Sequence, residues 1–507
     1  MFIFAPMTIV TVLAAWVIFK LAMQLVFYPQ FFTRLKHIPS PKHRSWLTGN
    51  SKSFAIEVPY GMIERWIKSM PDASMIRYYI VGNFEWVLLT SPEAIYEMLI
   101  KRAYDFEKPE LIRHVMQHLV GDGIVLAEGG QHKVQRRSLN PAFSKRHIEN
   151  LHDMFWSKSL DMVDLMKNDL ATRIKGDNII QISHWSSRVT LDIIGQAAMG
   201  IEFDSLRSPE NALYQAYRKL MAPSTSEKVL SAICILLLHP KIIYKFPTRR
   251  NHEIRAAQRT ISDAARRVIQ QRMAEKETDE KKIDIISLAI NSKEFTEDEL
   301  VDQAMTFLSA GHETTAAALQ WSVYALCKYQ DVQTKLREEV RACLPASSIK
   351  SSDFRSPAIR TLSFLNAFCD EVLRYYPPIP KTIRTAVRDT SITGLSIPKG
   401  TMFVINHMEG LWGPNAKVFD PNRFLSPTGE YQRPKSNNYA LLTFLHGPRN
   451  CIAQEFAKAE LCFLICSLVA NFHMELQSPD EDILVDEDVT MRPRDGVFAR
   501  FAILKRS

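Results

Sequence analysis

The feature that most constrains the fold is a long helical pattern in the middle of the chain. It starts at Thr296, where Glu299 follows three residues later, the spacing of a helix capping box. Apolar residues with helical period continue to about Tyr329. Roughly 33 residues at about 1.5 Å each give a helix of about 50 Å. Such a helix can cross a large domain, so we expect its centre to be buried.

The rest of the chain favours one large domain around that helix. Of the 507 residues 46% are hydrophobic and 23% charged, an ordinary globular balance. Length alone suggests domains of roughly 150 residues each. No Gly/Ser linker, low-complexity tract or internal repeat divides the chain in that way. Strand-like runs are few until late in the chain, which predicts a mainly α domain with a minor β region over residues 51–507.

The N-terminus predicts a membrane anchor over residues 1–28. Residues 1–19 carry no charged side chain, and apolar residues resume after Lys20 up to Tyr28. About 20 apolar residues are enough to span a bilayer. Positive charge follows the span, which predicts a single pass with the remainder in the cytoplasm. The alternative, a cleaved signal peptide, lacks its basic n-region and a clear cleavage site.

Residues 29–50 then read as a basic, proline-rich hinge. Pro39 and Pro41 fix φ and exclude a helix there. An ordinary loop is the alternative, and the position directly after an anchor favours the hinge.

Charge and cysteine usage exclude several classes of protein. The net charge of +8 comes from Lys and Arg scattered along the chain, and no nucleic-acid motif is present. The seven cysteines are widely spaced and contain no CxxC, so neither a disulfide framework nor a zinc site is indicated. This usage suits a reducing compartment. Cys462 and Cys466, four apart in an apolar helical stretch, are expected to be small core residues.

The centre of the long helix contains unfavourable residues. Gly311 costs about 1 kcal/mol relative to alanine in a helix interior. Thr314 and Thr315 carry hydroxyls that compete for backbone carbonyls. Gly311 and Thr314 are three apart and share one face. Room for a flat ligand explains the pattern, and a packing notch against a neighbouring helix explains it equally well.

A second candidate segment runs from Phe444 to Cys451, directly before an apolar helical stretch. A thiolate at the start of a helix is stabilised by free amides and the positive end of the dipole. Gly447 lets the loop backbone approach a ligand closely, and Arg449 can pair with a carboxylate. This combination suits a haem, whose iron accepts a cysteine ligand and whose propionates need cations. The alternative is a buried structural cysteine.

Two further arginines and one glutamate can brace this loop. Glu371 and Arg374 are three apart and share one helical face. Arg423 lies in an irregular segment marked by Pro421. Together they can form a bidentate network, although a glutamate and arginine at this spacing occur by chance in many helices.

These segments together resemble the cytochrome P450 superfamily, in order and over nearly the whole chain. The last segment matches its FxxGxRxC motif, Glu371 and Arg374 match ExxR, and Arg423 matches PxRF. Ala310 to Thr314 match the AGxET stretch of its oxygen-activation helix. The anchor and hinge match microsomal members. The resemblance implies the cytochrome P450 fold, haem b with Cys451 as axial ligand, and a location in the endoplasmic reticulum membrane.

The resemblance also implies further cofactor contacts. His132 stands where the family usually has tryptophan in a WxxxR helix, so His132 and Arg136 are expected to face haem propionates, as is Arg384. Ala453 replaces a common glycine. The cofactor-binding residues implied are His132, Arg136, Ala310, Gly311, Arg384, Phe444, Gly447, Arg449 and Cys451.

For catalysis, the resemblance implies that Thr314 holds bound oxygen or a water and that Glu313 relays protons inward. A salt bridge on the far side of the helix is the alternative for Glu313. No GxGxxG motif or flavin extension is present, so electrons are expected from an NADPH-dependent flavoprotein reductase.

The function expected is a monooxygenase that inserts one oxygen atom from O2 into a lipophilic small molecule. His132 and the AGHETT stretch resemble fungal members, which favours an intermediate of secondary metabolism: a terpenoid, polyketide or alkaloid. The apolar residues 229–246 suggest entry from the bilayer, or an ordinary core helix. The alternatives are a fatty-acid or xenobiotic hydroxylase, a haem-thiolate isomerase or dehydratase, and a non-catalytic haem sensor or scaffold.

Overall fold

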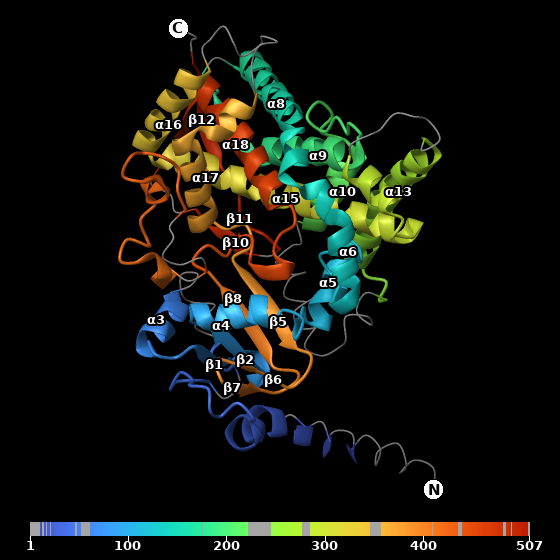
Figure 1. Ribbon diagram of the computed structural model, residues 1–507, viewed down its shortest axis with the longest axis vertical. Coiled ribbons are helices and arrows are strands. Elements are labelled where there is room, and N and C mark those ends of the chain that lie inside the picture. Colours follow the sequence, from blue (N-terminus) through green and yellow to red (C-terminus); the bar gives the residue numbers. More distant parts are fainter. Residues whose placement is uncertain are drawn as a thin grey trace. The chain divides into compact units, whose positions relative to one another are not determined.

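The computed structural model describes most of the chain as two compact units (Figure 1). The sheet unit comprises Met1–Pro109, Lys381–Lys417 and Asn437–Asn450, and the helical unit comprises Glu110–Pro380, Val418–Ser436 and Cys451–Ser507. Each unit is therefore assembled from separated stretches of the single domain expected over residues 51–507, and no linker marks the division. The residues described are 11–12, 15–16, 18–20, 22–45, 48–51, 61–174, 176–221, 245–275, 284–344, 356–407, 409–433, 439–479, 483–487 and 489–504.

The sheet unit is built on a mixed sheet with strand order β1-β2-β8-β5-β3. Its segments MIRYY, EWVLL and MFVIN are rich in β-branched and aromatic residues, which pack well on a pleated surface. β2 and β8 pair in parallel, and the other neighbours pair antiparallel. The strands are β1 (Met75–Tyr79), β2 (Glu85–Leu89), β3 (Phe106–Glu107), β5 (Lys381–Ala386) and β8 (Met402–Asn406), with the hairpin β6 (Thr390–Ile392) and β7 (Leu395–Ile397).

Short helices complete the sheet unit. Met75, Val87, Phe106 and Phe403 belong to one buried apolar cluster beside the sheet. The helical elements are the π-helix η1 (Met23–Phe32), α3 (Gly61–Ser69), the 3-10 turn η2 (Val81–Asn83), α4 (Pro92–Tyr96), the π-helix η3 (Glu97–Lys101), and the 3-10 turns η6 (Glu409–Trp412) and η8 (Gly447–Arg449).

The helical unit is arranged around α15 (Glu297–Lys328), the long helix expected from the sequence. Its capping box is confirmed, because the Thr296 hydroxyl accepts from the Glu299 amide at 3.3 Å and the Glu299 carboxylate accepts from the Thr296 amide at 2.9 Å. Most of its residues from Leu300 onward are buried, as expected. It packs against α5, α9, α13, α17 and α18 (Figure 1).

The remaining elements confirm a mainly helical fold with small sheets. The helices are α5 (Glu110–Val120), α6 (Gly129–Leu139), α7 (Lys145–Glu149), α8 (His152–Thr172), α9 (Ile182–Met199), α10 (Ala212–Met221), α13 (Arg249–Glu275), α14 (Ile285–Ser292), α16 (Gln330–Cys343), α17 (Ser363–Tyr375) and α18 (Gln454–Asn471). The strands are β4 (Ile179–Gln181), β9 (Phe472–Leu476), β10 (Val485–Glu487), β11 (Met491–Pro493) and β12 (Phe498–Ile503).

The predicted N-terminal anchor falls partly outside the described residues, since residues 1–10, 13, 14, 17 and 21 are not among them. Among the residues that are described, no helix combines the length and the apolar character needed to cross a membrane. η1 ends at Phe32, and the described part of the expected hinge beyond it is non-helical. The apolar stretch 229–246 lies outside the described residues except for positions 245 and 246.

The capping box generates a stability prediction. In Thr296→Ala the first turn of α15 loses a hydroxyl acceptor, so we expect the free energy of unfolding to fall by about 1 kcal/mol. The matched control is Thr260→Ala, because Thr260 lies within α13 and its exposed hydroxyl donates to the carbonyl of Ala256 in the same helix. Denaturant unfolding followed by circular dichroism measures both variants, and equal stability of the two would contradict a role for the cap.

Candidate active site

Cys451 lies three residues ahead of the first residue of α18. Burial raises the pKa of its thiol, whereas a hydrogen bond from the backbone amide of Ala453 and the charge of Arg136 lower it. Its side chain is nevertheless exposed, while Cys369, Cys462 and Cys466 are fully buried. An exposed cysteine that accepts an amide hydrogen bond and lies within range of a cation is suited to bind a metal as thiolate, because a coordinating metal displaces the thiol proton.

The loop that leads to Cys451 packs closely at Gly447, and the contact of this glycine with a ligand stays a prediction. Gly447 has a φ of +79°, and a Cβ atom there would collide with the backbone carbonyl of Leu99 in η3. The sequence suggested that this glycine allows close approach to a ligand. The structure shows that it allows close approach to protein backbone within the sheet unit, so glycine is required there for packing. Phe444 and Arg449 belong to the same loop, and their contacts with a cofactor stay predictions.

Arg384 is a buried cation on β5. It is 3% exposed, and it donates to the hydroxyl of Thr382 at 2.6 Å and to the carbonyl of Ile383 at 2.8 Å. Burial lowers its pKa to about 10. Within the described residues no carboxylate forms an ion pair with it, and a buried guanidinium of this kind suits an anionic group such as a propionate.

Arg136 lies on α6 in the helical unit. Its Nε donates to Asn140 Oδ1 at 2.9 Å, and its charge acts on Cys451. His132, one turn earlier on the same face, is 3% exposed. The two residues expected to face a propionate therefore share one helix face, and at least Arg136 lies within electrostatic range of the cysteine.

Glu313 forms the salt bridge that the sequence left open as its alternative. Its carboxylate accepts from the guanidinium of Arg492 at 2.9 Å and from the hydroxyl of Thr490 at 3.2 Å. Its second oxygen lies 3.7 Å from His312 Nε2. Burial lowers the pKa of His312, so this imidazole favours its neutral form. The acid is thus held by β11 and the residue before it.

The other residues of the motif also have partners. The Thr314 hydroxyl donates to the carbonyl of Ala310 at 2.8 Å, the backbone bond expected of a threonine inside a helix. A Cβ at Gly311 would lie 2.7 Å from the side chain of Ile194 on α9. The missing side chain of Gly311 therefore makes room for Ile194, which is the packing notch that the sequence suggested. Contacts of Ala310 and Gly311 with a cofactor stay predictions.

The predicted network around Glu371 is present. Arg374 donates to both of its carboxylate oxygens, from Nε at 2.6 Å and from Nη2 at 2.7 Å. Arg423 Nε lies 3.6 Å from the same carboxylate, and the amide of Asp420 donates to it at 2.8 Å. Both arginines also donate to the carbonyl of Val418. Burial raises the pKa of Glu371, and the two guanidinium groups oppose that effect.

Two features escaped the sequence analysis. Arg492 lies 179 residues from Glu313, and no local signal joins them. Glu460 on α18 is fully buried, and neither of its carboxylate oxygens has a hydrogen-bond partner among the described residues. Burial raises the pKa of Glu460 well above its usual value, and the nearby Thr315 hydroxyl opposes this. An acid flanked by Ala459 and Leu461 in the apolar part of the stretch after Cys451 was the signal that could have identified it.

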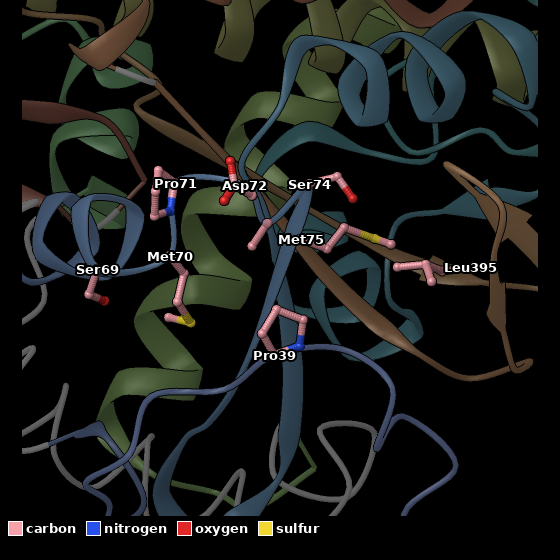
Figure 2. Close-up of a pocket in the computed structure, with 9 residues that line it drawn as sticks. Pro39, Ser69, Met70, Pro71, Asp72, Ser74, Met75 and Leu395 are labelled. Carbon is pink, nitrogen blue, oxygen red and sulfur yellow. The ribbon is translucent and has the colours of Figure 1, made fainter.

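A pocket of about 460 Å³ lies in the sheet unit (Figure 2). It is formed by Pro39, the turn from Ser69 to Met75 and Leu395, and its charged side chain is Asp72. It contains none of the predicted site residues, so we assign it no part in the chemistry.

Comparison with known proteins agrees with this geometry. The family model for Cytochrome P450 matches residues 39–499. The chain is 46% identical to the cytochrome P450 monooxygenase sphH of Aspergillus fumigatus, over 97% of this chain and 93% of that protein. It is 35% identical to ALT8 of Alternaria alternata, over 94% and 91%, and 36% identical to FUM15 of Gibberella moniliformis, over 92% and 87%, both named as cytochrome P450 monooxygenases. With a match of this extent, the chain belongs to the cytochrome P450 family and is an oxidoreductase of its monooxygenase type.

Proposed function

We propose that the chain binds haem b through the Cys451 thiolate and inserts one oxygen atom from O2 into a lipophilic small molecule. The observation that carries the proposal is the environment of Cys451, an exposed sulfur at the head of α18 with an amide donor and the charge of Arg136. When bound, a haem with a cysteine ligand supplies the reductive activation of oxygen.

The protein's own contribution begins with holding the cofactor. Arg384 offers a buried guanidinium that no described carboxylate neutralises, and Arg136 offers a second cation. Both suit propionate groups, because charge-assisted hydrogen bonds from guanidinium to carboxylate are strong in a dry environment. His132, on the face of Arg136, is proposed as a third contact.

Proton supply is assigned to Glu313 and Thr314. The Thr314 hydroxyl donates its hydrogen to the carbonyl of Ala310, and its oxygen keeps a lone pair that can accept a hydrogen bond. Glu313 is held by Arg492, so it must leave that ion pair, or pass a proton through water, to reach the helix face of Thr314. We infer that the strength of the ion pair with Arg492 determines how readily the Glu313 side chain moves toward Thr314. The presence of both groups favours oxygen activation over the isomerase or dehydratase alternative.

Substrate, partner and location are proposed more broadly. The relatives named above come from fungi, which supports an intermediate of fungal secondary metabolism as substrate class. An NADPH-dependent flavoprotein reductase and an endoplasmic reticulum anchor over residues 1–28 follow from the microsomal resemblance. The deciding experiment combines the full chain, reductase, NADPH and ¹⁸O2 with fungal lipophilic extracts. A product that carries one ¹⁸O atom supports the proposal, and turnover without oxygen or NADPH would contradict it.

The assignment of the ligand is tested by Cys451→Ser. We expect the reduced carbon monoxide complex to lose its red-shifted Soret band, because an alcohol cannot replace the thiolate donor. Cys343→Ser, a change at a partly exposed cysteine on α16, is the control and should keep the band. Persistence of the band in Cys451→Ser would show that another residue binds the iron.

The role of Thr314 is tested by Thr314→Ala. We expect haem binding to persist while product formed per NADPH falls on the order of tenfold and peroxide release rises. The control is Ser322→Ala, because Ser322 lies on the same helix and makes the same backbone bond, to Ala318 at 2.7 Å. Unchanged coupling in Thr314→Ala would remove this hydroxyl from the proton path.

The role of Arg384 is tested by loss of haem to apomyoglobin. In Arg384→Leu we expect the rate of haem loss to rise on the order of tenfold, since the anionic side chain of the cofactor loses its partner, and Arg384→Lys should recover part of it. Arg388→Leu, at an exposed arginine just beyond the same strand, serves as control. Equal rates in Arg384→Leu and the control would place the propionates elsewhere.

A further inference from the structure

A pair of thiols lies between two helices of the helical unit. The sulfur of Cys369 on α17 is 3.5 Å from the sulfur of Cys462 on α18, and both residues are fully buried. The sequence predicted Cys462 to be a plain core residue, and nothing in the sequence joins it to a cysteine 93 positions away. A disulfide has an S–S bond of about 2.05 Å, so the two sulfurs are about 1.5 Å short of bonding.

A guanidinium group contacts one sulfur of this pair. Arg360 Nη1 lies 3.1 Å from the Cys462 sulfur and also donates to Asn366 Oδ1 at 3.2 Å. Glu455 forms an ion pair with it at 3.8 Å through a side chain that is 49% exposed, so solvent weakens that ion pair. The positive charge is therefore available to stabilise a thiolate at Cys462.

The two sulfurs differ in acidity for physical reasons. The hydrogen bond with Cys369, and then the charges of Arg360 and Lys458, lower the pKa of Cys462 to about 7 against the effect of burial. Burial, the contact with Cys462 and the neighbouring Asp370 raise the pKa of Cys369. The pair thus combines a group that ionises near neutral pH with a thiol that can follow it, as in reactive dithiols.

The same helix supplies a contrast. Cys466 lies one turn after Cys462 on α18 and is equally buried. Burial and the neighbouring Cys343, Cys462 and Glu339 raise the pKa of Cys466 well above its usual value. Burial therefore does not distinguish Cys462 from Cys466. The contacts of Cys462 with Cys369 and Arg360 do.

We propose that Cys369 and Cys462 form a redox-active dithiol that hydrogen peroxide converts into a disulfide joining α17 to α18. The Cys462 thiolate attacks one peroxide oxygen, the O–O bond breaks, and the hydroxide that leaves takes a proton to become water. Cys369 then loses its proton and attacks the sulfenic sulfur, which releases a second water. Two thiols and one peroxide give one disulfide and two waters.

The position of the bond gives it a consequence for the fold. Cys369 lies two residues before Glu371 on α17, and Cys462 lies on the helix that Cys451 precedes. A disulfide would close a long loop and fix the helix of the Glu371 network to the helix behind the cysteine ligand. The dithiol is the resting form in a reducing compartment, and the disulfide forms under peroxide stress.

The test uses the full purified chain, with imidazole added so that peroxide does not react at the iron. After exposure to hydrogen peroxide and alkylation of free thiols, peptide mass spectrometry should find Cys369 linked to Cys462 and Cys466 alkylated. The protein should also unfold at a higher temperature until dithiothreitol is added. Because the readout is a peptide mass, it does not depend on the proposed substrate or on haem chemistry.

Variants test which residues the cross-link requires. Cys369→Ser and Cys462→Ser should abolish the cross-link, and Cys466→Ser should keep it. Arg360→Gln should slow its formation on the order of tenfold, and Arg360→Lys should restore the rate. Absence of the cross-link in the unaltered chain would overturn the proposal, as would linkage of Cys462 to Cys466. An equal rate in folded Arg360→Gln and the unaltered chain would overturn the part assigned to Arg360.

Discussion

A carboxylate with no exposure to water, that of Glu371, organises the helical unit. Two guanidinium groups and one backbone amide converge on it. An ion buried in this way is costly unless nearly all its hydrogen-bonding capacity is used, and loss of one partner typically costs about 3–5 kcal/mol. The network therefore specifies geometry more than it adds stability. It fixes the irregular segment around Val418 and Asp420 to α17.

The position of Cys451 depends on that rigidity. α17 packs against α18, and the cysteine precedes α18 by three residues, so the orientation of the sulfur follows from how these helices are held. The same two helices carry the Cys369–Cys462 pair and the buried Glu460. The region behind Cys451 is therefore rich in polar groups that only tertiary packing brings together, and the disulfide that we propose there would stiffen it.

The sequence was sufficient to predict features that depend on residues close to one another along the chain. The capping box at Thr296, the ion pair of Glu371 with Arg374 and the helix after Cys451 each depend on residues within one turn or directly next to one another, and all three are present. Gly311 shows the limit of such signals. A glycine at this position is explained equally well by a nearby cofactor and by the side chain of Ile194, and the sequence cannot distinguish the two. The partner of Glu313 lies far away in sequence, so helical spacing could not find it.

The proposed chemistry requires that the Cys451 thiolate at the head of α18 binds iron. X-ray absorption spectroscopy of the ferric protein at the iron edge tests it most directly, because it reports the atoms bound to the metal. We expect one sulfur neighbour beside the porphyrin nitrogens. A coordination shell of nitrogen and oxygen alone would contradict it.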